Sequence, residues 1–325
     1  MTRFPHGISS MGIPVLGGAG IPFTGTYYFV KPSTGSDSNS GLEPGKALKT
    51  LAQAQTKATA NKNDVVYLIA ESNTAADTTD YQSATLTWAK DLVHLIGIGA
   101  PSIVSQRSRI AQLSTATAVS PLVNVTANGC YIANISAFQG VADATSLIDV
   151  QVTGARNVFE NVHFAGIGHA TMSAAGACSL KLEGGAENVF RGCVIGVDTI
   201  DTDADGVNLL CDTAATRNLF EECLFQLWIT ATGASHVKLV DTTAIDRWLW
   251  FKRCLFASES VNKTIDMAEV FNIPAGISQG KIILQDCAAM DDGGAPVWTA
   301  GTEGIVWANM PAPTASAAGG LMTNL

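Results

Sequence analysis

The feature that most constrains this chain is a short phrase that recurs about every 31 residues. The phrase places Phe159, Phe190, Phe220 and Phe251 in one slot, at intervals of 31, 30 and 31 residues. A period of this length is too long for a heptad and fits one supersecondary unit per repeat. The slot extends back to Ile132 and forward to Leu284, so the repeat spans most of the sequence.

Each unit carries a second apolar run upstream of the phrase. These runs are Val150-Gln151-Val152, Leu180-Lys181-Leu182, Val207-Asn208-Leu209 and Val237-Lys238-Leu239. They are short and alternate with period two, which predicts strands with one buried face. A repeat of short strands and turns predicts a β-solenoid.

Stacked coils bring equivalent residues of successive repeats together at the strand spacing of roughly 4.7–4.9 Å. We therefore expect three ladders: a phenylalanine ladder inside, a second interior file of cysteines, and a turn ladder of asparagines whose amides bond up and down the stack. The cysteine file comprises Cys193, Cys223, Cys254 and Cys287, and the asparagine ladder comprises Asn157, Asn188 and Asn218.

Composition and charge exclude some classes of function. The 325 residues carry a formal net charge of −9 and no run of Lys or Arg, which argues against nucleic acid as a partner. No stretch reaches the roughly 18 consecutive apolar residues of a membrane span, and the N-terminus lacks the apolar core of a signal peptide. We expect synthesis in a cytoplasm and no membrane partner. The seven cysteines include no C-x-x-C pair, which favours buried thiols over disulfides or a metal site.

Four segments are expected. Residues 1–26 form an extended N-terminal arm, 27–62 a strand, loop and capping helix, 63–290 the solenoid, and 291–325 a C-terminal cap and extended tail, with Trp298 and Trp307 closing the C-terminal end. The arm is rich in Pro and Gly and has too little apolar surface to order itself, so we expect it to lie against a partner or a neighbouring copy. Its expected contact residues are Phe4, Pro5, His6, Ile8, Ile13, Pro14, Val15 and Leu16.

The helix is expected over residues 47–58, with Leu48, Leu51, Ala52, Gln55 and Ala58 on one face. The order of a strand, a G-S-D-x-N-x-G-L loop (35–42), an A-L-K-T-L helix and a D-V-V-Y-L strand resembles the opening of right-handed parallel β-helix proteins of the pectate-lyase-like superfamily. The resemblance implies an all-β, right-handed, single-stranded parallel β-helix with a short N-terminal capping helix and extended terminal arms. The helix would cover the open strand edges of the first coil.

The arm carries a second resemblance. Arg3-Phe4-Pro5-His6-Gly7-Ile8, followed by Gly12-Ile13-Pro14-Val15-Leu16-Gly17 and the Phe29-Val30 strand, is similar to structural proteins of tailed phages that contain this β-helix. The resemblance implies a virion component whose partners are capsid or other virion proteins.

One motif suggests a cation. Asp201-Thr202-Asp203-Ala204-Asp205-Gly206 matches the first half of a Ca²⁺ loop, with Asp201, Asp203 and Asp205 as ligands. Asn208 stands where a full EF-hand needs an apolar residue, so the alternatives are a partial calcium turn or a solvated acidic turn. No other cofactor is expected.

No catalytic cluster is identified. Carboxylates such as Glu221, Glu222 and Asp241 fall on several coils, where solvated surface positions are the ordinary explanation. Arg156, Arg217 and Arg247, with Glu187 between them, are expected to form ion pairs along a turn file. The histidines share no ligand spacing, and His163 alternates with buried neighbours and so is expected to point outward.

Three tryptophans form the expected contact between copies, with a trimer as the assembly: Trp228, Trp248 and Trp250. Trp248 and Trp250 alternate on one strand and would share a face, and a sugar-binding strip is the other reading of these rings.

Together these observations favour a non-enzymatic phage virion protein, a capsid decoration or head-associated cement protein held by its N-terminal arm. The alternative is a tailspike-type β-helix that binds or cleaves polysaccharide. A secreted lyase is disfavoured by the missing signal peptide.

Overall fold

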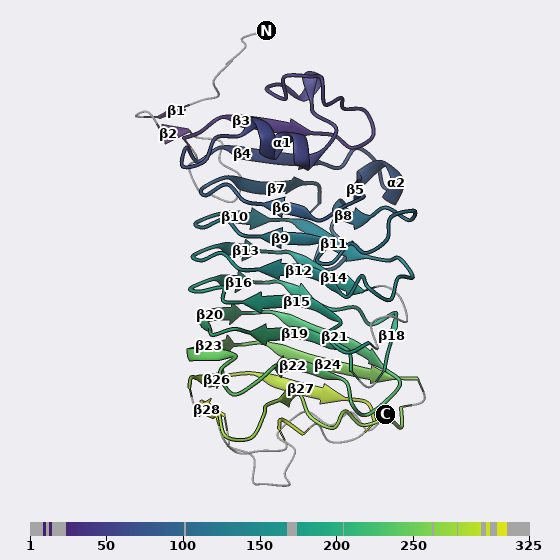
Figure 1. Ribbon diagram of the computed structural model, residues 1–325, viewed down its shortest axis with the longest axis vertical. Helices are drawn as coiled ribbons and strands as arrows, with labels where there is room; N and C mark the ends of the chain where they lie inside the picture. Colours follow the sequence, from purple (N-terminus) through teal and green to yellow (C-terminus); the bar gives the residue numbers. More distant parts are fainter. Residues whose placement is uncertain are drawn as a thin grey trace.

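The chain folds as a right-handed parallel β-solenoid of about seven turns, as the repeat predicts. The computed structural model describes residues 24–100, 102–167, 174–203, 205–261, 263–277, 279–293, 297–299 and 304–310, and the backbone of Ser9–Ser10 and Ile13–Pro14. Figure 1 shows the coils stacked along the long axis, with the short helix α1 at the N-terminal end.

Three parallel sheets, here named B, C and D, run along the solenoid, and most coils contribute a strand to each of them. Sheet B contains β3 (Tyr27–Val30), β4 (Val65–Ile69), β7 (His94–Ile98), β10 (Tyr131–Ala133), β13 (Val158–Glu160), β16 (Val189–Arg191), β20 (Ala215–Glu221), β23 (Ile245–Lys252), β26 (Lys281–Gln285) and β28 (Ile305–Ala308). Sheet C contains β5 (Thr79–Gln82), β8 (Ser108–Gln112), β11 (Ile135–Gln139), β14 (His163–Ile167), β17 (Val194–Ile195), β18 (Asp201–Thr202), β21 (Leu224–Ile229), β24 (Leu255–Ser260) and β27 (Ala288–Asp291). Sheet D contains β6 (Leu86–Trp88), β9 (Val123–Val125), β12 (Ile148–Val152), β15 (Cys178–Glu183), β19 (Val207–Asp212), β22 (Ser235–Leu239) and β25 (Phe271–Asn272).

The phenylalanine ladder is confirmed. Strand register pairs Phe159 with Phe190, Phe190 with Phe220, Phe220 with Phe251, and Phe251 with Leu284. The successive ring centroids lie 4.7, 4.4 and 5.1 Å apart, and the ring planes are within 15° of parallel. The repeat period therefore equals one turn of the solenoid.

The asparagine ladder is also confirmed. Asn157, Asn188 and Asn218 are fully buried at the corner where sheet D leads into sheet B. The Asn157 backbone N–H donates to Asn188 Oδ1 at 2.9 Å, and the Asn188 N–H donates to Asn218 Oδ1 at 2.9 Å. Each Nδ2 donates to a backbone carbonyl of the preceding coil, as Asn218 does to Gly185 at 2.9 Å. These side chains replace the ladder hydrogen bonds that the corner interrupts.

The cysteine file contains thiols and no disulfides among the described residues. Cys193, Cys223, Cys254 and Cys287 occupy equivalent positions after the phenylalanine slot, and each Sγ lies 3.4–3.5 Å from the carbonyl oxygen of the phenylalanine one coil earlier. They pack as small apolar side chains with weak S–H donors.

One turn feature was not predicted. The residue between the B strand and the C strand of successive coils adopts a left-handed conformation, with φ between +50° and +57°. This file comprises Asn134, Asn161, Gly192, Glu222, Arg253 and Asp286. Asparagine, aspartate and glycine are types that favour this conformation, whereas the corner geometry imposes it on Glu222 and Arg253.

The N-terminal cap differs in detail from the expectation. Helix α1 spans only Leu51–Lys57, with Ala54 buried and Ala52 exposed, so the expected helical face was partly wrong. Leu48 precedes the helix and bridges Val30 in parallel, as an edge of sheet B. Asp37, from the polar loop, accepts hydrogen bonds from the backbone N–H groups of Lys49 and Thr50 at 2.9 and 3.0 Å, which fixes where the helix begins. Two shorter helical elements are the 3₁₀ turn η2 (Pro44–Lys46) and α2 (Ala75–Thr78).

The solenoid continues beyond the expected boundary at residue 290. Strand β28 pairs in parallel with β26, placing Trp307 in the slot after Leu284. Trp298 is 2% exposed, and its ring lies 5.7 Å from that of Trp307 and 6.2 Å from that of Phe271. The two tryptophans therefore close the interior, as expected.

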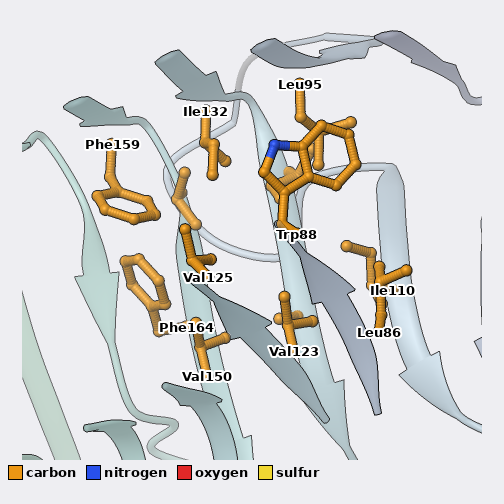
Figure 2. A pocket seen from close by; sticks show the side chains of 13 residues that line it. Leu86, Trp88, Leu95, Ile110, Val123, Val125, Ile132, Val150, Phe159 and Phe164 are labelled. Carbon is orange, nitrogen blue, oxygen red and sulfur yellow. The ribbon is translucent and has the colours of Figure 1, made fainter. Parts of the chain in front are cut away.

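The N-terminal half of the interior contains a small apolar cavity of about 20 Å³ (Figure 2). Its wall includes Trp88, Val125, Ile132 and Phe159, and the indole N–H of Trp88 donates to the Val93 carbonyl at 2.9 Å. A space of this size without polar partners stays dry. It marks where aliphatic side chains replace the phenylalanine ladder, and it is a packing void rather than a ligand site.

We predict that Phe190→Ala lowers the free energy of unfolding by about 3–5 kcal/mol, because it removes the middle ring of the buried ladder. Val189→Ala, on the outer face of the same strand, is the matched control and should cost less than about 1 kcal/mol. Urea denaturation followed by far-UV circular dichroism measures both. Equal losses of unfolding free energy in the two variants would show that the stacked rings contribute no more stability than an outward-facing side chain.

Candidate functional site

The outer face of sheet B carries a continuous line of apolar side chains. They alternate with the buried phenylalanines and are paired in register from coil to coil. We call this line the apolar file; it comprises Val158, Val189, Leu219, Trp250, Ile283 and Val306. Its members are half-buried, except for Val306, which is 43% exposed. The same register that stacks the interior therefore builds an apolar stripe on the exterior.

The expected tryptophan pair lies on this face. Trp248 and Trp250 are neighbours on β23, with ring centroids 6.2 Å apart and ring planes nearly perpendicular. Trp228 lies on sheet C, in register with Asp201 and Glu259, so it belongs to a different surface. The shared face of Trp248 and Trp250 is thus confirmed, and a contact between copies at the three tryptophans stays a prediction.

A column of alternating charges runs beside the apolar file. Register aligns Glu160, Arg191, Glu221 and Lys252. The Glu221 carboxylate lies 2.9 Å from Lys252 Nζ and 3.3 Å from Arg191 Nε, and the hydrogen bond from Lys252 is the main cause of its lowered pKa. Arg253 joins the network, 2.9 Å from Glu221 and 2.7 Å from Glu222. The two glutamates are therefore engaged in ion pairs.

The expected ion pairs along the turn file are found at the edge of sheet B. Arg156 Nε lies 2.6 Å from the Glu187 carboxylate, and Arg217 bonds the other oxygen of the same carboxylate. Arg247 pairs instead with Asp246 at 3.6 Å, where its side chain is 61% exposed. Exposed pairs of this kind contribute little stability.

The acidic turn lies at the corner between sheets C and D. Asp201 belongs to β18, which pairs with β21, and Asp201, Asp203 and Asp205 are all exposed. Within the described residues, no group of three or more His, Cys, Asp or Glu side chains is arranged to hold a metal ion. Calcium binding at this turn stays a prediction.

A buried polar ladder on sheet D was missed from the sequence. Asp149, Ser179, Asn208 and His236 follow one another in register on four coils and are fully buried. Asp149 Oδ2 accepts the Gly166 N–H at 2.9 Å, and Asn208 Nδ2 donates to the Gln226 carbonyl at 3.2 Å, so the ladder ties sheet D to sheet C. Its residues occupy alternating positions that the sequence pattern assigns to solvent, so no signal in the sequence distinguished them.

The ladder holds two groups that must be neutral. Burial raises the pKa of Asp149 well above its usual range, and burial lowers the pKa of His236 to about 3. Among the described residues, Asp149 Oδ1 and His236 Nε2 have no hydrogen-bond partner. Ionisation of either group would place an unpaired charge in the interior.

Three buried histidines share one hydrogen-bonding mode. His94 Nδ1 accepts the Tyr131 N–H at 3.0 Å, His163 Nδ1 accepts the Ser105 N–H at 2.9 Å, and His236 Nδ1 lies 3.0 Å from Asn208 Nδ2. Burial lowers the pKa of all three, that of His94 to about 4. His163 does point out of sheet C, as expected, but it is only 3% exposed.

The arm residues expected to contact a partner, Phe4 to Leu16, lie outside the described residues except for the backbone of two short strands. β1 (Ser9–Ser10) and β2 (Ile13–Pro14) pair with each other in antiparallel fashion. The contacts of the arm stay a prediction. In the part of the chain that the structure describes, no helix has the length and apolar character needed to cross a membrane.

Comparison with known proteins identifies no family for this chain. No protein-family model matches the chain, and no curated protein matches it. Among solved structures, pectate lyase Pel9A is similar with a TM-score of 0.48 and 11% identity, over 89% of this chain and 82% of that one. A pectin methylesterase in complex with a hexasaccharide gives a TM-score of 0.46 and 15% identity over 87% and 81%. A rhamnogalacturonan lyase gives 0.44 and 14% over 83% and 75%. With TM-scores below 0.5 and identities of 15% or less, these likenesses assign neither a family nor a role to the chain.

We predict that Asp149→Asn stabilises the protein at neutral pH. Wild-type Asp149 keeps its proton when folded and ionises near pH 3.8 when unfolded, so its contribution is greatest below pH 3.8 and is lost as the pH rises. The difference in unfolding free energy between the variant and the wild type should therefore increase with pH, by up to about 1.4 kcal/mol per pH unit. Urea midpoints measured from pH 4 to pH 8 give this difference.

His236→Asn is the control of opposite sign. His236 has a folded pKa of about 3 against an ordinary value of 6.5, so the wild type loses its contribution as the pH falls below 6.5, and the variant does not. A pH-independent difference for both variants would contradict the assignment of two neutral buried groups.

Proposed function

We propose that this protein is a non-enzymatic structural component of a tailed-phage particle. In this proposal it is a capsid decoration or head-associated protein, held to the shell by residues 1–26 and assembled as a homo-oligomer, with a trimer as the assembly. The host cytoplasm is the site of synthesis and the virion is the destination. In this proposal calcium bound at the acidic turn would support the fold of the turn and would not define the function.

The observation that carries the proposal is the apolar file on the outer face of sheet B. Six aligned apolar side chains, one of them Trp250, and the adjacent Trp248 lie on one exterior face, which is a surface that a protein packing against others needs. The file is as regular as the interior ladders, since both follow from one register. A surface of this kind supports assembly.

The interior suits a load-bearing role. Buried rings stack from Phe159 to Phe251 and buried amides from Asn157 to Asn218, so each coil is held by the coils on either side of it. The phage assignment rests on the similarity of the arm to tailed-phage structural proteins, including Phe4-Pro5-His6 and Ile13-Pro14-Val15.

A second candidate function is polysaccharide binding of the tailspike type. The supporting observation is the Trp248–Trp250 pair, because two aromatic rings on an open sheet face can stack against sugar rings. Titration of the tryptophan fluorescence with host surface polysaccharide separates the two ideas. Saturable quenching that is lost in Trp248→Ala would favour glycan binding over assembly.

We predict that a chain lacking residues 1–23 remains folded and no longer joins the particle. The solenoid begins at β3, so removal of the arm leaves every parallel pair of sheets B, C and D in place. Phage grown with only the truncated gene, purified and examined by mass spectrometry, shows whether the protein is incorporated, and circular dichroism of the purified chain reports the fold.

The matched control is a chain that lacks residues 311–325, a deletion of similar size at the other terminus, which should still be incorporated. Normal incorporation of the arm-deleted chain would show that the arm is not the anchor.

A further inference from the structure

Charge is distributed unevenly around the solenoid. The ten strands of sheet B contain five basic residues (Arg191, Arg217, Arg247, Lys252 and Lys281) and three acidic ones (Glu160, Glu221 and Asp246). Their formal sum is +2, in a chain whose formal net charge is −9. The face that carries the apolar file is thus the basic face of an acidic protein.

The connections from sheet C to sheet D have the opposite character. We call their described residues, in segments 113–122, 140–147, 196–206, 230–234 and 261–270, the acidic corner. It contains seven acidic residues and one basic residue, Lys263, for a formal sum of −6. The acidic residues are Asp143, Asp198, Asp201, Asp203, Asp205, Asp266 and Glu269.

The two regions lie on opposite sides of the rod. Each coil visits sheets B, C and D in turn, so the corner between C and D is across the section from sheet B. Apolar side chains are also exposed at or beside the acidic corner: Val261 is 50% exposed, and half-buried Trp228 lies in register with Asp201. Each region therefore combines exposed apolar surface with an excess of one sign of charge.

We propose that a second copy of this chain docks its acidic corner on the outer face of sheet B. The inference rests on the proposed structural role and names the partner of the apolar file. The contact is heterologous, because it joins two different surfaces of the same chain. It buries the Trp248–Trp250 pair against apolar and acidic side chains, and it sets the basic excess of one copy against the acidic excess of the next.

Charge also decides against the symmetric alternative. Packing sheet B on sheet B would bring two basic faces together, and packing corner on corner would bring two strongly acidic surfaces together. In the heterologous arrangement each copy docks its acidic corner on one neighbour and accepts the acidic corner of another neighbour on its own sheet B. Such contacts close into a ring when the rotation between neighbours allows it, and otherwise form a filament.

The test is a charge swap between the two surfaces. One variant carries Arg247→Glu and Lys281→Glu on sheet B, a second carries Asp201→Lys and Asp203→Lys at the corner, and a third carries all four changes. Sedimentation equilibrium of the full chain measures self-association. Each double variant should associate about ten-fold or more weakly than the wild type, because like charges then meet across the contact. The fourfold variant should recover wild-type association, and its formal net charge is again −9.

The control is Lys46→Glu with Lys49→Glu, two exposed lysines beside the N-terminal helix, which changes the net charge as the sheet B variant does and should leave association unchanged. Thermal melts confirm that each variant folds. Failure of the fourfold variant to recover, or a wild-type chain that stays monomeric, would overturn the inference.

Incorporation into particles is scored separately. A wild-type chain that is incorporated but does not self-associate would reject this interface and leave the structural role in place, whereas a wild-type chain that self-associates and never enters particles would reject the structural role instead.

Discussion

The rest of the structure depends on the parallel register between successive coils. Because Phe159, Phe190, Phe220 and Phe251 are paired directly, the strand positions beside them are paired directly as well. Each side chain then has its own equivalents above and below it. A residue type that gains from contact with itself, such as a stacking ring or an amide that both donates and accepts, is favoured at that slot.

This constraint explains what the sequence could predict. The period, the phenylalanine ladder, the asparagine ladder and the cysteine file all follow from like residues recurring at one interval, and all are present in the structure. The ion pairs of Glu187 with Arg156 and Arg217 follow from opposite charges at equivalent turn positions. These features needed no knowledge of how the sheets face one another.

What the sequence could not predict depends on contacts between different sheets. Asp149, Ser179, Asn208 and His236 occupy positions that alternation assigns to solvent, yet the extended strands of sheet C cover them. Helix α1 begins at the N-cap Thr50, whose hydroxyl accepts the Gln53 N–H, and Asp37 of the polar loop holds the backbone of Thr50 in place, a contact that helix propensity at residue 47 does not reveal. The placement of Trp228 away from Trp248 and Trp250 likewise requires the order of the three sheets.

On the exterior the register can place like charges next to one another, which does not arise in the apolar interior. Stacking brings equivalent charges within about 5 Å of each other, so a column of one sign would be unstable, and sheet B instead alternates Glu160, Arg191, Glu221 and Lys252. The connections from sheet C to sheet D vary in length, so their carboxylates are not held in one column by strand register. Acidic residues can therefore accumulate at that corner, while sheet B keeps a small basic excess. The separation of charge across the rod is thus a consequence of the same pairing that builds the core.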